Sequence, residues 1–128
     1  MMVARIPVVL VVEDDVDIAM LVSYALEESN CTVVRARDGE RAVELAADRA
    51  FDVVLLDVRL PRMNGEQVAE HLKLMPNPPA MILFSASADL ATLATRIGAV
   101  DYIRKPFDLD DLTERVERAI VRRNSEPV

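Results

Sequence analysis

Three carboxylates follow two apolar runs of this sequence. Asp57 comes directly after the run Val53–Leu56, and the earlier run Val8–Val12 is followed at once by Glu13 and Asp14. Short continuous apolar runs of this kind are typical of buried parallel strands. Two such strands that deliver acids at their carboxyl ends bring negative groups together, which costs free energy unless a cation or a phosphoryl group uses them.

This group of acids has the chemistry of a hard-cation site. Mg²⁺ takes oxygen ligands and keeps several waters, which phosphate oxygens can replace. Asp57 can also act as a nucleophile, because a carboxylate that attacks phosphorus forms an aspartyl phosphate. We therefore expect a site for Mg²⁺, or for another divalent cation such as Mn²⁺, which would offset the repulsion between the attacking and attacked anions.

Two further strand ends carry groups that bind phosphate. Ser85 closes the apolar run Met81–Phe84, and Lys105 follows the shorter run Asp101–Ile103. The ammonium group can neutralise phosphoryl oxygens, and the hydroxyl can donate to the same oxygens once they arrive. A serine at a strand end also commonly forms hydrogen bonds with loop backbone. A role for Ser85 in phosphate contact is therefore predicted only because the acids and Lys105 lie at the neighbouring strand ends.

Five strand-helix units are needed to position these residues. Three central strands and two more polar edge strands, at residues 32–36 and 101–103, alternate with segments in which apolar residues recur at helical spacing. The helical segments span residues 18–25, 42–46, 68–75, 90–97 and 112–120. This alternation predicts an α/β fold with a doubly wound parallel sheet in the order 2-1-3-4-5 and helices on both faces, hence three layers. Its ligand crevice lies between the first and third strands.

Boundary residues agree with this pattern. Asp15 or Asp17 can cap the first helix, Asp38 the second and Ser87 the fourth, because short oxygen-bearing side chains accept from free N–H groups at helix starts. Gly98 suits the carboxyl cap of the fourth helix. Asp15 is assigned to capping and not to metal binding.

Size and composition predict one globular domain, at residues 5–123, followed by a short polar tail at 124–128. The net charge of −7 predicts repulsion from nucleic acid and from anionic membrane surfaces. No apolar run reaches the roughly 18 residues of a membrane span. The single cysteine, Cys31, cannot form an internal disulfide, which favours a reducing compartment. We therefore expect a cytoplasmic protein without direct contact to nucleic acid or membrane.

Taken together, the motifs resemble the receiver domain of two-component response regulators, and the match covers nearly the whole chain. The motifs are Glu13-Asp14-Asp15 after the first strand, Asp57 to Gly65 after the third, Ser85-Ala86 after the fourth, and Gly98 to Phe107 around the fifth. The resemblance implies a flavodoxin-like (βα)5 fold and a part in phosphorelay signal transduction, typically bacterial.

The resemblance also implies a role for the acids. Asp57 would accept the phosphoryl group and become an aspartyl phosphate. Glu13 and Asp14 would form the acidic pair around Mg²⁺, with Asp14 the closer ligand and Asp57 a third. The backbone carbonyl of Arg59 would be a further ligand.

A second set of residues would sense the phosphoryl group. By resemblance, Ser85 is the switch hydroxyl, Tyr102 the switch aromatic and Lys105 the phosphate-contacting lysine, and the bond before Pro106 is cis, which proline alone makes cheap. Tyr102 has a second interpretation as a half-buried aromatic of an edge strand. The only histidine, His71, is interpreted as a solvated surface residue.

The expected partners follow from the same resemblance. A sensor histidine kinase or a phosphotransfer protein would donate phosphate, and the face formed by the fourth helix, fifth strand and fifth helix would bind a downstream protein or a second copy as a homodimer. The chain would be a signalling switch and not an enzyme, catalysing only its own phosphorylation and dephosphorylation. The segment from Ser85 to Gly98 is shorter than receivers usually have, so we expect a trimmed fourth helix or preceding loop.

Two other functions compete with this one. A phosphatase of the haloacid dehalogenase type also uses a strand-end aspartate, but it needs a second acid two residues on, where this chain has Arg59. An adaptor with a receiver fold could work without phosphorylation, although the intact acids and Lys105 argue against that. Nucleotide-binding glycine motifs are absent from the sequence.

Overall fold

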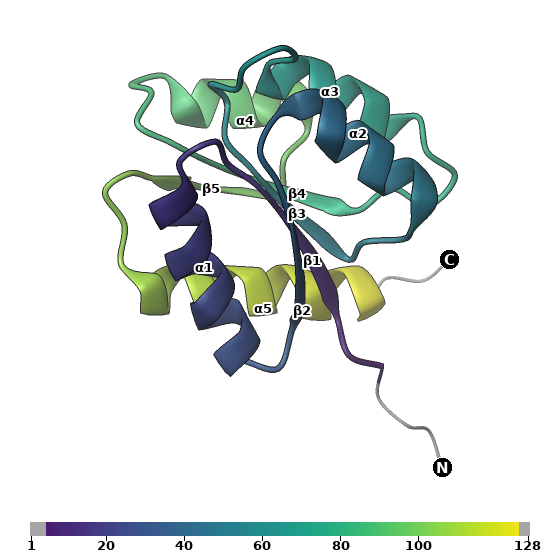
Figure 1. The fold of residues 1–128 in the computed structure, drawn as a ribbon, viewed down its shortest axis with the longest axis vertical. Coiled ribbons are helices and arrows are strands. Elements are labelled where there is room, and N and C mark those ends of the chain that lie inside the picture. The colour runs from purple at the N-terminus through teal and green to yellow at the C-terminus, as the bar shows by residue number, and fades with distance from the viewer. Residues whose placement is uncertain (1–4, 126–128) are drawn as a thin grey trace.

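A single parallel sheet organises the protein, whose computed structural model describes residues 5–125. Within that range the strands are β1 (Val8–Val12), β2 (Thr32–Ala36), β3 (Val53–Leu56), β4 (Ala80–Ser85) and β5 (Asp101–Arg104). They lie in the order β2-β1-β3-β4-β5, and every neighbouring pair is parallel. The predicted α/β class, strand order and edge strands are therefore confirmed (Figure 1).

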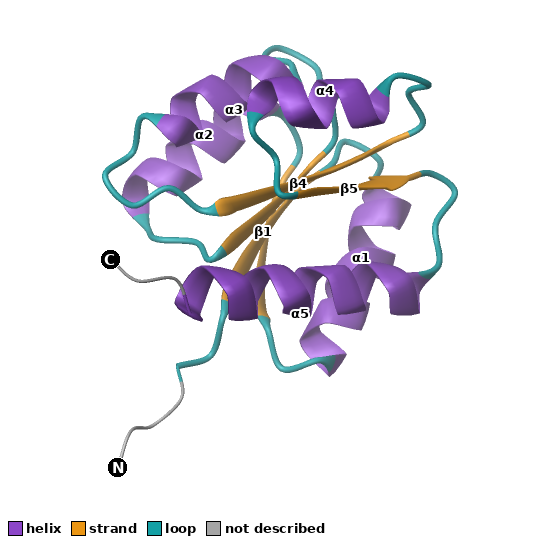
Figure 2. Cartoon of the chain, turned by 180° about the vertical axis from the view of Figure 1, so that it is seen from behind, coloured by secondary structure: helices purple, strands orange, loops and turns teal. Residues whose placement is uncertain are grey.

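Helices cover both faces of this sheet and make the three layers. They are α1 (Val16–Glu28), α2 (Gly39–Asp48), α3 (Gly65–Lys73), α4 (Leu90–Ile97) and α5 (Leu109–Ser125). α2, α3 and α4 lie on one face, and α1 and α5 lie on the other (Figure 2). Parallel strands are joined by right-handed crossovers. The crossover from β1 to β2 runs in one direction across the sheet and the later crossovers run in the other, so α1 lies on one face and α2, α3 and α4 lie on the opposite face.

The central strand β1 shows why the sequence folds this way. Its residues Val9 to Val12 are all fully buried, because alternate side chains enter the cores on the two faces. Leu10 and Val12 pack with α2, α3 and α4, whereas Val9 and Val11 pack with α1 and α5. A strand buried on both faces must be apolar throughout, which explains why the acids appear only after its last residue.

Helix ends agree with the sequence at three of the four predicted caps. Asp15 caps α1 by accepting from the N–H groups of Asp17 and Ile18, and Asp38 caps α2. Gly98 ends α4 with a φ of 79°, in the left-handed region that glycine adopts readily.

Three boundaries differ from the prediction. Ser87 does not cap α4, since the helix begins two residues later than that assignment requires, after Asp89. α3 ends at Lys73 and not at residue 75. α5 continues to Ser125, into the predicted tail, whose residues 126–128 lie outside the described range. No helix between residues 5 and 125 has the length and apolarity to cross a membrane.

Candidate functional site

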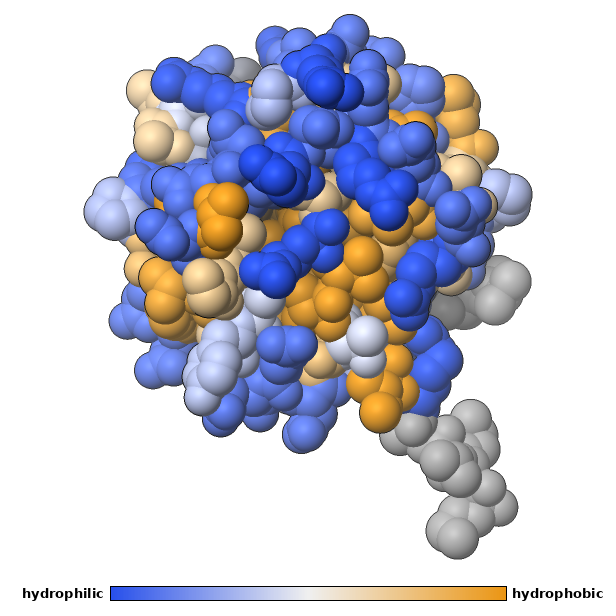
Figure 3. Space-filling model, in the orientation of Figure 1, coloured by the Kyte–Doolittle hydropathy of each residue, from blue (hydrophilic) through white to orange (hydrophobic). Residues whose placement is uncertain are grey.

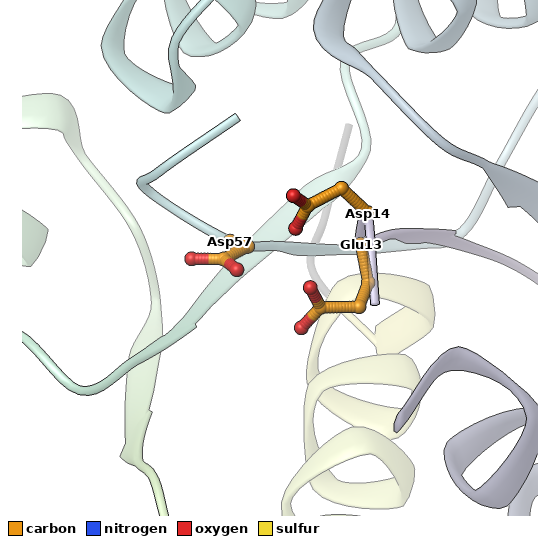
Figure 4. A group of neighbouring side chains, drawn as sticks. All are labelled: Glu13, Asp14 and Asp57. Atoms are coloured by element: carbon orange, nitrogen blue, oxygen red, sulfur yellow. The ribbon is translucent and has the colours of Figure 1, made fainter. Parts of the chain in front are cut away.

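The predicted acids meet at the carboxyl ends of β1 and β3. Val12 and Leu56 are partners in the register of these strands, so the residues that follow them start side by side. Carboxylate oxygens of Glu13, Asp14 and Asp57 lie within 4.8 Å of one another. Figure 4 shows the three carboxyl groups turned toward the same space. The structure therefore brings together the three acids that the sequence analysis selected.

Lys105 supplies the positive charge of this cluster. Its ammonium group donates to Asp57 Oδ2 at 3.1 Å and also pairs with Glu13 Oε1. The side chains of Glu13 and Asp57 are only 1% and 7% exposed, and that of Lys105 is 17% exposed. Two nearly buried carboxylates thus share one ammonium group, and their negative charge is only partly neutralised.

This imbalance perturbs the acid-base properties of the site. Burial raises the pKa of Glu13 to about 7, although hydrogen bonds from Lys105 and from the Asp15 N–H act in the opposite direction. Burial acts to lower the pKa of Lys105, but the hydrogen bonds to Glu13 and Asp57 outweigh it and raise that pKa above its ordinary value. The negative charge of the site is therefore not fully compensated, and a bound divalent cation would compensate it.

The donor set fits such a cation. All three acids offer oxygen, the ligand type that Mg²⁺ and Mn²⁺ prefer. Opposite ligands of an octahedral Mg²⁺ are about 4 Å apart, which is compatible with oxygens within 4.8 Å of one another. Asp14 is exposed, so the cluster opens to solvent on one side, where water or phosphate oxygens can enter.

The loop after Asp57 is held close to this carboxylate. The backbone N–H of Arg59 donates to Asp57 Oδ1 at 3.1 Å. Gly65 lies under the same loop, because a Cβ there would come within 2.8 Å of Val58 Cα and 2.9 Å of Asp57 O. The role of the Arg59 carbonyl as a metal ligand stays a prediction.

Ser85 ends β4 beside the acids, but its hydroxyl is engaged elsewhere. Ser85 Oγ lies 3.2 Å from Ser87 Oγ and 3.4 Å from the Ser87 N–H. Both serines are buried. No hydrogen bond joins Ser85 Oγ to Asp57 or Lys105 in the part of the chain that the structure describes.

The remaining predicted residues lie on β5, just after it and on α3. Tyr102 is 38% exposed on the edge strand β5. The bond between Lys105 and Pro106 is cis. His71 is exposed on α3, as the sequence analysis expected.

The sequence analysis missed one residue near the site, Arg104, and one contact, between the hydroxyls of Ser85 and Ser87. Arg104 Nη1 donates to Ser87 O at 2.6 Å and approaches Ala88 O at 3.4 Å, so it holds the loop that carries Ser87. Arg104 shares the face of β5 with Tyr102 by strand alternation, which was the available signal. The contact between the two serine hydroxyls had no signal beyond their spacing of two residues.

Comparison with known proteins decides the family. Residues 9–117 match the family model described as "Response regulator receiver domain". The chain belongs to this family. It is therefore the receiver domain of a response regulator in two-component signalling, and phosphorylation of an aspartate is typical of such domains.

Individual relatives agree with this assignment. The response regulator ArlR of Staphylococcus saprophyticus is 34% identical over 116 residues, which is 90% of this chain and 52% of ArlR. The transcriptional regulatory protein CpxR of Escherichia coli is 36% identical over 117 residues, covering 91% of this chain and 50% of CpxR. This receiver thus spans about half the length of these curated relatives.

A solved structure supports the fold in the same way. The receiver domain of the Francisella response regulator 1452 superposes with a TM-score of 0.84 at 30% identity, and the match covers 91% of this chain and 98% of that domain.

Proposed function

We propose that this receiver accepts a phosphoryl group on Asp57 with the help of a divalent cation and thereby switches its binding to a partner protein. The observation that carries the proposal is the surroundings of the Asp57 carboxylate, which is nearly buried, lies among the oxygens of Glu13 and Asp14 and accepts from Lys105. A carboxylate placed only to cap a loop does not need a second and third acid beside it.

The residues have distinct parts in the transfer. A carboxylate oxygen of Asp57 attacks phosphorus, the new O–P bond forms, and the bond from phosphorus to the donor's leaving group breaks. When bound by Glu13, Asp14, Asp57 and the Arg59 carbonyl, Mg²⁺ supplies positive charge that offsets the repulsion between these anions. Lys105 already lies at hydrogen-bonding distance from Asp57 and can pair with a phosphoryl oxygen, and Ser85 can donate to another after it leaves Ser87.

The surface beside the site supports a protein as phosphodonor. Four exposed large apolar residues, Val16, Met20, Leu21 and Tyr24, lie on α1, the helix that starts next to the acids. Figure 3 shows hydrophobic surface over this region. Val16 also lines a hollow of about 360 Å³ that reaches Glu13. An apolar helix face next to the pocket suits docking by a helix of a sensor histidine kinase or a phosphotransfer protein.

The face formed by α4, β5 and α5 is the proposed output surface, for a downstream protein or a second copy. Val100 and Tyr102 are exposed there by 47% and 38%. Tyr102 on β5 is the register partner of Leu83 on β4, which lies two residues before Ser85. A movement at Ser85 therefore has only a short distance to travel to this face. Phosphorylation would shift a conformational equilibrium that already exists in the unmodified protein.

The test is incubation with acetyl phosphate, with and without Mg²⁺, followed by mass spectrometry of the intact protein. We expect one added phosphoryl group that requires Mg²⁺ and is absent in Asp57→Asn. Asp48→Asn, which removes the same charge from an exposed residue at the end of α2, should be modified like the wild type. An unmodified wild-type protein would contradict the proposal and favour an adaptor that works without phosphate.

A further inference from the structure

The hydroxyl of Ser85 makes its hydrogen bonds within its own loop. Ser87 contacts it twice, through Oγ at 3.2 Å and through the backbone N–H at 3.4 Å. The carbonyl of Ser85 is fixed as well, because it accepts from the Lys105 N–H at 2.9 Å within the sheet. Only the side chain of Ser85 can therefore change partners while β4 and β5 stay paired.

Arg104 fixes the other end of this contact. It is the register partner of Ser85 on β5, and its guanidinium reaches across to Ser87 O at 2.6 Å and Ala88 O at 3.4 Å. The distance to Ser87 O is short for an N–H···O bond, as expected when the donor is charged. Ser87 is thus held from one side by Arg104 while it holds Ser85 on the other.

The loop has little else to keep it in place. α4 starts after Asp89, whose side chain makes no capping hydrogen bond, and residues 86–89 are all that separate β4 from α4. A helix start without a side-chain cap is less firmly placed than a capped one. Arg104 therefore contributes a hydrogen bond that the helix start does not provide for itself.

We infer that Ser87 and Arg104 are positioning residues that hold the Ser85 hydroxyl in a retracted position and so oppose its move to a phosphoryl group on Asp57. This inference rests on the proposed function. A contact that exists only in the unmodified arrangement stabilises that arrangement, so its removal shifts the equilibrium toward the phosphoryl-bound one. One hydrogen bond of ordinary net strength corresponds to roughly a fivefold change in an equilibrium constant.

The experiment measures the affinity of beryllofluoride, which stands in for the phosphoryl group on Asp57, in the presence of Mg²⁺. The variants are Ser87→Ala, which removes one hydroxyl, and Arg104→Met, which keeps the length of the side chain but removes its donors. Fluorine NMR of the bound probe reports its surroundings, and the affinity for Mg²⁺ alone is measured in parallel.

We expect each variant to bind beryllofluoride about fivefold more tightly than the wild type, with the affinity for Mg²⁺ unchanged. The direction is informative for Arg104→Met, because losing a positive charge near an anion site would by itself weaken anion binding. The double variant should gain less than the sum of the two single gains in free energy, because both residues hold the same loop.

Conservative variants and a charge control complete the design. Arg104→Lys retains a charged donor and should stay closer to the wild type than Arg104→Met. Arg118→Met, which removes the same charge from an exposed position on α5, should bind the probe like the wild type. Thermal unfolding of each variant shows whether the fold is intact. If Arg104→Met does not fold, the result for Ser87→Ala alone decides the test.

Unchanged or weaker beryllofluoride binding by a folded Ser87→Ala would overturn the inference while leaving phosphorylation of Asp57 standing. If the wild-type protein binds no beryllofluoride, both the inference and the proposed phosphorylation of Asp57 are contradicted.

Discussion

Replacing Glu13 by Gln should stabilise the metal-free protein at pH 8. The Glu13 carboxyl is buried, and burial raises its pKa from 4.5 to about 7. An acid with a higher pKa in the fold than in the unfolded chain holds its proton longer in the fold, so stability falls as pH rises between the two values. The destabilisation therefore develops between about pH 4.5 and 7 and is complete above that range.

The size of the effect follows from this pKa. Each pKa unit corresponds to about 1.4 kcal/mol, so ionising Glu13 in the fold costs on the order of 3 kcal/mol. Gln has nearly the shape of a protonated Glu and avoids that cost at every pH. The variant should therefore exceed the wild type in free energy of unfolding by up to about 3 kcal/mol at pH 8 and by almost nothing near the unfolded-state value of 4.5.

The assay is urea unfolding in the presence of EDTA at both pH values, since the linear dependence on denaturant yields the free energy of unfolding. Asp14→Asn is the matched control, because it removes a charge from the same cluster at an exposed position. Adding Mg²⁺ at pH 8 should reverse the order, since a ligand that binds only the folded state stabilises it and the wild type binds more tightly. A variant that is no more stable at pH 8 than at pH 4.5, relative to the wild type, would refute the reasoning.

Two further changes test the framework of the fold, one at the amino end of β3 and one beside the site. Asp52→Asn should destabilise the protein by about 2 kcal/mol at pH 7, because the buried Asp52 carboxylate pairs with Arg5 at 2.6 Å and with Arg123 at 3.3 Å. Burial acts to raise the pKa of Asp52, but the hydrogen bonds from Arg5 and from the Val8 N–H, together with the charges of Arg5 and Arg123, outweigh burial and lower that pKa. This stability is present above pH 3.8 and lost at lower pH, so urea unfolding should show a smaller difference from the wild type near pH 3. Gly65→Ala should destabilise the protein by about 1 to 3 kcal/mol, because the added Cβ would lie 2.9 Å from Asp57 O. The variant should also be modified more slowly by acetyl phosphate. A variant with the stability and the modification rate of the wild type would contradict the close packing between Gly65 and this loop.

The fold was predictable because its pattern is local. β1 and β3 are buried on both faces, so each is a continuous apolar run that ends where the sheet ends. The acids at those ends were predictable for the same reason, since parallel strands share a carboxyl edge and Val12 lies beside Leu56. Caps such as Asp15 and Asp38 depend only on neighbouring residues, and these predictions were confirmed.

What could not be predicted depends on side chains that are distant in sequence. Ser87 is a residue type that often caps helices, yet its hydroxyl contacts Ser85, and its carbonyl accepts from Arg104, 17 residues later. Asp52 lies at the start of β3, where an acid looks solvated, but Arg5 and Arg123 approach it from the two ends of the chain. Local spacing carries no information about such partners, and their geometry comes only from the assembled sheet.

The most direct measurement of the central claim is the location of the phosphoryl group. After incubation with acetyl phosphate and Mg²⁺, borohydride reduction converts an aspartyl phosphate to homoserine, and peptide mass mapping identifies the position. We predict homoserine at position 57 alone, in the peptide that contains the end of β3. Homoserine at another acid, or none in a protein that has gained a phosphoryl group, would contradict the assignment of Asp57 as the acceptor.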